Sequence, residues 1–227
     1  MNASPARLRI DFVSDVACPW CAIGLASLQQ ALAALDDTVQ AEIHLQPFEL
    51  DPRLPLEGED ADERLMHKYG IGEAQLEENR RMIRDRAAPL GVAINTRRGS
   101  RVWNTFDAHR LLHWAGTQDR ALALALKQAL FRAYFTDEEN VADRDVLVRI
   151  ATAVGLDAAQ ARAMLESDAY AEEVRAQEQR YQQAGVQSVP TTIINGKWVI
   201  PGGQLPEMFE GALRDIASKA STGAGAA

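Results

Sequence analysis

The sequence predicts an α/β protein in which a small α/β unit is interrupted by a long, all-α helical insertion. Three observations support this fold class. A strand, a helix and a second strand fit the hydrophobic pattern of the first fifty residues, and a helical pattern follows over 61–184. The α/β character then returns at Val189 to Ile200, where two β-rich runs flank Asn195 and Gly196.

The first α/β unit is defined by its periodicity. Residues 7–14 alternate apolar and polar side chains and predict a strand. A helix is predicted from Trp20 onward, because apolar residues recur at spacings of three and four: Cys21, Leu25, Leu28, Leu32 and Leu35. Residues 42–49 predict a second strand, in which Pro47 indicates a sheet edge or a strand end. Two strands joined by such a helix are expected to run parallel.

The rest of the chain sets the expected domain boundaries. Residues 51–60 are rich in proline and acids and predict a linker, and an amphipathic helix is expected over 205–218. We therefore expect a discontinuous α/β domain (1–60 and 185–220), a helical insertion domain (61–184) and a disordered tail (221–227).

Composition and charge exclude several classes of partner. The 227 residues are 47% hydrophobic and carry a net charge of −8, which disfavours binding to nucleic acid or to an anionic membrane surface. Met1 to Arg9 lacks the apolar run of a secretory signal, and no apolar stretch elsewhere is long enough to span a bilayer. We therefore expect a cytoplasmic protein without nucleic-acid or membrane partners.

The two cysteines, Cys18 and Cys21, are the most informative residues. A disulfide framework or a structural zinc site needs more ligands than this pair, so no metal and no bound cofactor are expected. A close pair at the start of a helix is typical of a redox-active CxxC. The alternatives are two inert buried cysteines or a soft-metal carrier with an outside ligand.

The predicted position of the pair explains how it would work. The N-terminus of a helix presents unpaired N–H groups and a positive dipole end, which favour a thiolate at Cys18. Residues three apart in the first turn share a helix face, so a disulfide can close with a small adjustment. Pro19 suits the first turn. Cys21 lies on the buried stripe and is expected to be the resolving thiol.

Several stretches of the chain together resemble a known family. The strand running into SDVACPWC, the long helical insertion and VPTTIING together resemble the DsbA family. FEL at 48–50, NTFDAHRLLHWA at 104–115 and FRAYFTDEENVADRDVL from Phe131 point to its FrnE-like cytoplasmic branch. The resemblance extends from Leu8 to Ser218.

The resemblance implies a thioredoxin fold with Cys18 as nucleophile and Cys21 as resolving thiol. It also implies that Pro190 is cis and faces the CxxC, and that the Val189 backbone pairs with an extended substrate peptide. We assign substrate binding to Pro19, Trp20, Val189 and Pro190. Because Trp20 stands where the best-known member has histidine, that member's strong oxidant character does not carry over.

A competing function comes from a related class with the same split architecture. The kappa glutathione transferases and hydroxychromene carboxylate isomerases use bound glutathione, and typically have serine at the position of Cys18 and no partner at Cys21. The presence of both cysteines favours dithiol exchange with protein or small-molecule disulfides, with glutathione as a possible redox partner. A non-catalytic chaperone or metal carrier is the third alternative. The direction of exchange, the physiological substrate and the oligomeric state stay open.

Two further groups of polar residues are interpreted as structural. His109 and His113 are four apart on a predicted helix, but without a carboxylate or cysteine at matching spacing a packed or surface pair is expected. Arginines interleaved with acids over 77–86 predict an exposed helix face.

Overall fold

A computed structural model describes residues 5–223 of the chain. The elements run in the order β1 (Ala6–Ser14), α1 (Pro19–Ala34), β2 (Val39–Pro47), β3 (Glu59–Asp60), α2 (Ala61–Tyr69), α3 (Glu73–Ala87), the 3₁₀ helix η1 (Ala88–Leu90), β4 (Arg101–Val102), α4 (Phe106–Gln118), α5 (Arg120–Phe135), α6 (Arg144–Ala153), α7 (Ala158–Glu166), α8 (Ala171–Gln183), β5 (Thr191–Ile194), β6 (Trp198–Pro201) and α9 (Pro206–Gly223).

The main sheet has the strand order β2-β1-β5-β6. β1 and β2 are parallel, as predicted, and pair from Ala6 opposite Val39 to Ser14 opposite Pro47. β5 is antiparallel to β1, and β6 is antiparallel to β5. β2 therefore forms one edge of the sheet, and Pro47 is its last residue, which agrees with the expected place of a proline.

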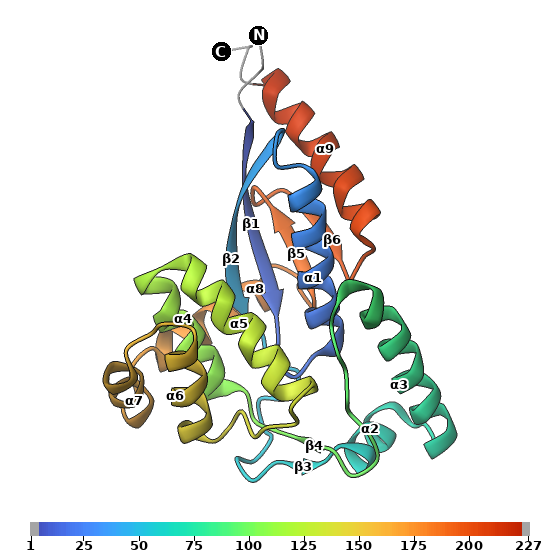
Figure 1. The fold of residues 1–227 in the computed structure, drawn as a ribbon, viewed down its shortest axis with the longest axis vertical. Coiled ribbons are helices and arrows are strands. Elements are labelled where there is room, and N and C mark those ends of the chain that lie inside the picture. Colours follow the sequence, from blue (N-terminus) through green and yellow to red (C-terminus); the bar gives the residue numbers. More distant parts are fainter. Residues whose placement is uncertain (1–4, 224–227) are drawn as a thin grey trace.

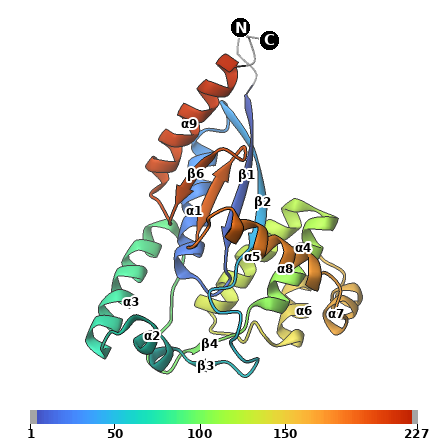
Figure 2. The same ribbon diagram turned by 180° about the vertical axis from the view of Figure 1, so that it is seen from behind.

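The two faces of the sheet are covered by different helices. α1 and α9 pack together on one face (Figure 1), while α8 crosses the other (Figure 2). Alternation along β1 explains this arrangement: Phe12 joins the core beneath α1, whereas its neighbour Val13 packs with Tyr181 of α8. The site of interest lies where β1 leads into α1.

The hairpin between β5 and β6 forms at the predicted residues. Asn195 and Gly196 both have positive φ, as a type I′ turn requires, and the Lys197 N–H donates to the Ile194 carbonyl at 3.1 Å. Strand pairing resumes with Trp198 opposite Ile194, so the loop is one residue longer than the two-residue loop of the simplest hairpin.

The segment expected to be helical throughout contains a long non-helical stretch. Gly91 takes positive φ and ends η1, and the chain then runs without a helix to Thr105, including β4, which pairs antiparallel with β3. This stretch is bound to α5 instead: the Asn95 N–H donates to the Phe135 carbonyl at 2.7 Å, and the Thr136 hydroxyl donates to the Ala93 carbonyl at 2.7 Å.

One arginine of the expected exposed face is buried. Arg80 is only 8% exposed, because α3 packs against α2 and brings its guanidinium to the carboxylate of Asp62. Arg81 is exposed as predicted, whereas Arg84 and Arg86 are half-buried.

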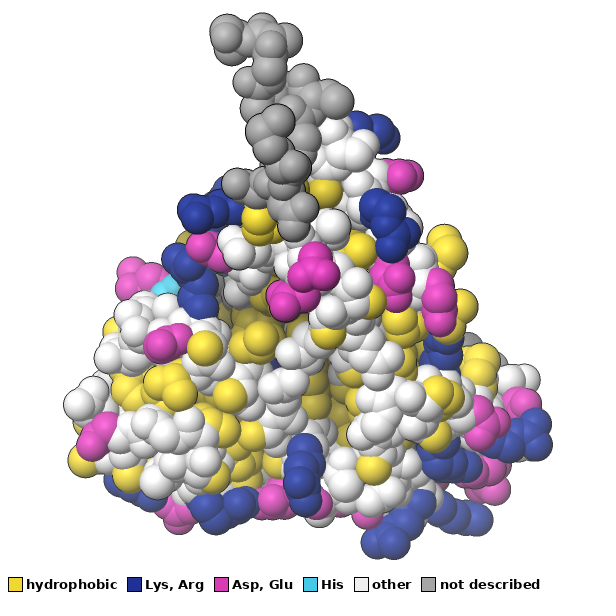
Figure 3. Space-filling model, turned by 45° about the horizontal axis from the view of Figure 1, so that its top comes forward, with side chains coloured by type: hydrophobic (Ala, Val, Ile, Leu, Met, Phe, Trp, Pro, Cys, Tyr) yellow, Lys and Arg dark blue, Asp and Glu magenta, His cyan; other side chains and the backbone are white. Residues whose placement is uncertain are grey.

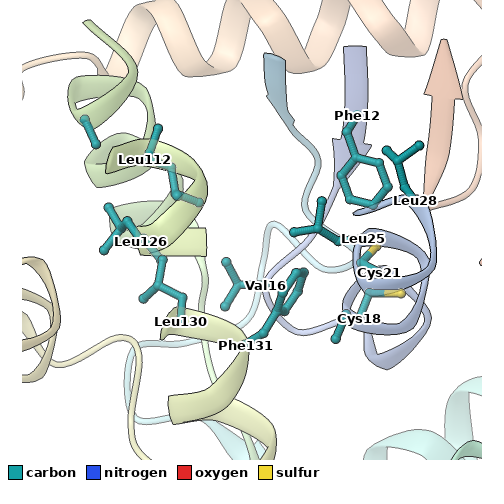
Figure 4. Close-up of a cluster of buried hydrophobic side chains, with 14 of the residues drawn as sticks. Phe12, Val16, Cys18, Cys21, Leu25, Leu28, Leu112, Leu126, Leu130 and Phe131 are labelled. Carbon is teal, nitrogen blue, oxygen red and sulfur yellow. The ribbon is translucent and has the colours of Figure 1, made fainter. Parts of the chain in front are cut away.

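A continuous hydrophobic core joins the α/β part and the helical insertion. Phe12, Leu25 and Leu28 of the α/β part belong to the same buried cluster as Leu126 and Leu130 of α5 (Figure 4). The predicted division into two domains is therefore not accompanied by two separate cores in the described residues.

The C-terminal end of the described chain is helical. α9 extends to Gly223, so residues 221–223 of the expected tail are helical, while 224–227 lie outside the described residues. Within 5–223, the helices are all too short or too polar to cross a membrane. On the face seen in Figure 3, basic side chains lie beside acidic ones, with hydrophobic side chains between them.

Candidate active site

Cys18 occupies the N-cap position of α1. Its backbone is extended (φ −97°, ψ 112°), Pro19 opens the helix, and no side-chain hydrogen bond caps this end. The Cys18 carbonyl accepts the N–H groups of Cys21 and Ala22 at 3.0 and 3.3 Å, which fixes the first turn. Its sulfur therefore lies at the end of the helix where N–H groups are unpaired, the position predicted from the sequence.

The loop before β5 lies over Cys18. Val189–Pro190 is a cis peptide bond, as the resemblance implies. The Cys18 thiol donates a hydrogen bond to the Val189 carbonyl, with an Sγ to O distance of 3.6 Å. This contact joins residues that are 171 positions apart in sequence, and it leaves Cys18 only 4% exposed. Cys18 is thus more enclosed than the access expected of an attacking cysteine.

Two glycines allow α1 to approach closely both this loop and the loop that follows β6. A Cβ built on Gly24 would lie 3.0 Å from Cγ of Pro190, and one built on Gly203 would lie 2.8 Å from the Trp20 carbonyl oxygen. Of the residues predicted to bind substrate, Pro19 and Trp20 are half-buried beside this contact. The structure therefore brings Pro19, Trp20, Val189 and Pro190 together around Cys18.

Cys21 lies behind Cys18 on the buried side of α1. Its side chain is fully buried, and both cysteines are free thiols. Burial raises the pKa of the Cys21 thiol well above its ordinary value, and the neighbouring Cys18 raises it further. The charge of Lys127 acts in the opposite direction. The inner thiol is therefore held in its neutral form.

Asp15 and His109 form a buried polar pair close behind the dithiol. Asp15 Oδ1 lies 3.3 Å from Nε2 of His109, and its Oδ2 accepts the Leu50 N–H at 2.7 Å. Burial alone would raise the pKa of Asp15, but the hydrogen bond and charge of His109, together with Leu50 and Lys127, lower it overall. A carboxylate is therefore retained at this buried position.

Lys127 of α5 is the third charged group behind the dithiol. Its side chain is 1% exposed, and its Nζ lies 4.9 Å from the centroid of the Phe131 ring. In Figure 4 that ring points toward Val16 and Cys18, and all three residues belong to one core cluster. Burial lowers the pKa of Lys127 to about 8, against the charges of Cys21, Asp15 and Cys18, which favour the ammonium form.

Sequence reasoning missed this inner layer. His109 is packed, which agrees with one of the two expectations, but its hydrogen bond to Asp15, 94 positions away, was not predicted. Lys127 gave no signal, because an isolated lysine in a helix ordinarily faces solvent. The only hint for His109 lay in its position within the NTFDAHRLLHWA stretch that supports the resemblance.

A groove runs beside the dithiol. It encloses about 590 Å³ between α1, the stretch that follows η1, and α5. Its walls include Ala22 and Leu25 of α1, Val92, and Phe131 and Arg132 of α5. Both parts of the molecule therefore shape this groove, which begins at Ala22, the residue after Cys21. No cluster of three or more metal-ligating side chains occurs among residues 5–223.

Comparison with known proteins identifies relatives of this arrangement. The profile of the DSBA-like thioredoxin domain matches residues 9–214. The crystal structure of a probable DsbA oxidoreductase from Streptomyces coelicolor is 38% identical, covers 92% of this chain and 89% of that chain, and superposes with a TM-score of 0.84. The uncharacterized protein YwbO of Bacillus subtilis (strain 168) is 30% identical in an alignment of 216 residues that covers 93% of this chain and 98% of YwbO.

More distant structures share the fold. A 2-hydroxychromene-2-carboxylate isomerase is 16% identical, with 94% and 98% of the two chains covered and a TM-score of 0.71. The cytosolic disulfide reductase DsbM from Pseudomonas aeruginosa, with GSH, is 17% identical, with 91% and 98% covered and a TM-score of 0.65. The same fold thus occurs in proteins with different activities.

Proposed function

The chain belongs to the DSBA-like thioredoxin domain family, and we propose that it is a thiol–disulfide oxidoreductase whose working pair is Cys18 and Cys21. The observation that carries this proposal is the position of Cys18 at the N-terminus of α1, facing the Val189 carbonyl, with a second thiol one turn behind it. Only a nucleophile backed by a resolving thiol needs both features.

The exchange begins at Cys18. Its thiolate attacks one sulfur of a substrate disulfide, a mixed disulfide forms, and the other substrate sulfur leaves as a thiolate. The Val189 carbonyl, which accepts from the Cys18 thiol in the free protein, is then released to accept an N–H of an extended substrate. Pro19 and Trp20 line the approach to the mixed disulfide.

Cys21 completes the cycle. Its sulfur attacks Cys18 in the mixed disulfide, the Cys18–Cys21 disulfide forms, and the reduced substrate leaves. The reverse sequence of steps would oxidise a substrate dithiol. We propose protein or small-molecule disulfides and thiols as substrates, with glutathione as a redox partner and the cytoplasm as the site of action.

Trapping of the mixed disulfide tests the roles of the two cysteines. Cys21→Ser is expected to accumulate mixed disulfides on Cys18, whereas Cys18→Ser should accumulate few and lose the reduction of insulin. Non-reducing electrophoresis of each variant, followed by mass spectrometry of the linked species, gives the measurement. Ala22→Ser is the matched control, because it adds a hydroxyl in the same buried turn and keeps both thiols. Trapping by Cys18→Ser alone would reverse the roles.

The same variants separate dithiol exchange from the glutathione-dependent isomerase alternative. An isomerase that binds glutathione would need only the side chain at position 18, so Cys21→Ser would keep full activity and trap nothing. A chaperone or metal carrier would keep its client or metal binding in both variants. Loss of turnover in both serine variants, with trapping in one, is expected only of a dithiol enzyme.

A further inference from the structure

Lys127 is a buried cation that the exchange chemistry described so far leaves without a role. Its side chain is almost completely buried, yet among residues 5–223 its amine makes no hydrogen bond and no ion pair within 4.0 Å. The Phe131 ring lies 4.9 Å from its Nζ, and the acidic groups that favour its charge, such as Asp15, are not in direct contact with it. Buried ammonium groups are normally paired, so this exception calls for a functional explanation.

The groups around Lys127 come from several packed elements. On the side of the dithiol, its charge interacts with Asp15, Cys18 and Cys21. On the opposite side lie the histidines of α4, the end of β2 and the middle of α8, whose facing side chains are His109, His113, Gln46 and Gln177. Two buried carboxylates lie beyond this layer: Glu49 interacts with His109, and Glu178 interacts with Asp15. Lys127 therefore stands between the thiols and a polar region.

A small cavity adjoins Lys127 on that polar side. Its volume is about 20 Å³. The side chains of Gln46, His109, His113 and Gln177 line it together with Lys127, and Leu45, Pro47 and Leu112 complete its walls. A cavity of this size with several polar side chains has room for one water molecule. His113 and Gln177 are half-buried, so the cavity extends from the buried amine toward the surface.

We propose that Lys127 accepts the proton of the Cys21 thiol during the resolving step and then releases this proton to solvent through the cavity. The inference rests on the proposed dithiol chemistry and assigns a role to the helical insertion within it. The neutral amine takes the proton of the Cys21 thiol. The resulting thiolate attacks Cys18, the new sulfur–sulfur bond forms, and the substrate sulfur leaves with the electron pair of the broken bond. The ammonium then releases its proton through the cavity.

The protonation equilibria of both groups suit this exchange. Burial raises the pKa of Cys21, so this thiol needs a nearby base before it can attack. Because burial lowers the pKa of Lys127 to about 8, roughly a tenth of the molecules carry the neutral amine at pH 7. The same pKa keeps proton release fast enough to regenerate the base in each cycle.

Reaction of the reduced, full-length protein with 5,5′-dithiobis(2-nitrobenzoate) separates the two steps. Attack by Cys18 releases the first thionitrobenzoate, and resolution by Cys21 releases the second. Stopped-flow absorbance is recorded at reagent concentrations that saturate the first phase, over pH 6 to 10. In the wild-type protein the rate of the second phase is expected to rise up to about pH 8 and then level off.

Lys127→Met removes the titrating group and keeps an apolar chain of similar length. We expect the second phase to slow by about 10²-fold at pH 7, the usual range for loss of a general base, and its rate to keep rising above pH 8. The first phase should change far less than the second, because the charge of Lys127 interacts more strongly with Cys21 than with Cys18, and it thereby reports intact folding. Lys197→Met, in the exposed hairpin turn, is the matched control and should change neither phase.

Lys127→Arg distinguishes proton exchange from a purely electrostatic effect, because arginine keeps the charge but does not release a proton. Proton exchange predicts that the arginine variant resolves as slowly as the methionine variant. Recovery of the wild-type second phase by Lys127→Arg, or an unchanged second phase in Lys127→Met, would overturn the assignment. Absence of any second phase in the wild-type protein would instead contradict the proposed dithiol function.

Discussion

The α/β part and the helical insertion contribute to the dithiol in different ways. Around Cys18, the α/β part supplies close backbone contacts: the Val189 carbonyl, and the approach of Trp20 and Gly203. Behind Cys21, the insertion supplies buried polar side chains, His109 and Lys127. Backbone contacts thus position the outer thiol, whereas burial holds the inner thiol neutral and the charge of Lys127 opposes that effect. A reaction that alternates between two thiols can use both kinds of control.

The largest expected effects concern whether the α/β part and the helical insertion unfold together or separately. Phe12→Ala in β1 and Leu130→Ala in α5 each empty a fully buried site in one shared core. We expect each to lower the free energy of unfolding by about 3–5 and 2–5 kcal/mol respectively, within one cooperative transition. Urea unfolding followed by both fluorescence and circular dichroism measures this. Leu56→Ala, at an exposed site, is the control. Two separate transitions would show that the parts are independent units.

A second test concerns how much the buried, charged amine of Lys127 lowers the free energy of unfolding. The pKa of Lys127 is about 8 in the folded protein and 10.5 when unperturbed, so the unfolded chain binds more protons between these values. Because of this residue, the free energy of unfolding therefore rises with pH between about pH 8 and 10.5. Lys127→Met should raise the free energy of unfolding by on the order of 3 kcal/mol at pH 7, and this gain should vanish by about pH 10.5. An equal difference at all pH values would contradict a buried, titrating amine.

The contacts around Cys18 are tested by adding one carbon atom. Gly203→Ala places a Cβ 2.8 Å from the Trp20 carbonyl, so the loop or α1 must shift. We expect a loss of about 1–3 kcal/mol of stability, together with a slower reaction of Cys18 with the disulfide reagent. Thermal unfolding and the first kinetic phase provide the two readouts. A neutral effect on both would mean that this contact does not position the outer thiol.

The smallest expected effects come from glycines that have no tight contacts. Gly211 in the middle of α9 has no atom within 4 Å of a built Cβ, and Gly116 in the last turn of α4 has only Ala123 at 3.9 Å. Gly211→Ala should stabilise the protein by about 0.5–1 kcal/mol, and Gly116→Ala by less, because alanine loses less entropy in a helix. The midpoint of thermal unfolding is a sufficient measure. A loss of stability at either site would indicate packing in solution that the structure lacks.

The parts of the fold that were predictable have local causes. The alternation along residues 7–14 and the apolar stripe from Cys21 predicted β1 and α1, and Asn195-Gly196 predicted the hairpin because few other residues tolerate positive φ. The stretch after Gly91 was not predictable, since hydrogen bonds to α5 hold it in place, such as that between Asn95 and Phe135.

The candidate site likewise has a part that the local sequence predicts and a part that depends on long-range packing. Cys18 and Cys21 lie three positions apart in sequence, and this spacing at a helix start indicates redox chemistry. Asp15 and His109, by contrast, meet only in the folded chain, and Lys127 is buried because Phe131 and α4 happen to cover the face on which it lies. Long-range packing decides which charged residues are buried, and periodicity in a single helix does not reveal it.

The place of the insertion between β2 and β5 has a consequence for biosynthesis. β1 finds its parallel partner β2 within the first fifty residues, but its other neighbour, β5, begins only at Thr191. A ribosome that adds about 5–20 residues per second needs roughly 10 to 40 s to supply it. During that interval one edge of β1 is unpaired and Cys18 lacks its Val189 cover, so the nascent chain passes through a stage that is open to both strand mispairing and premature thiol oxidation. Chaperones that hold the emerging chain would act on this protein mainly before its last forty residues appear.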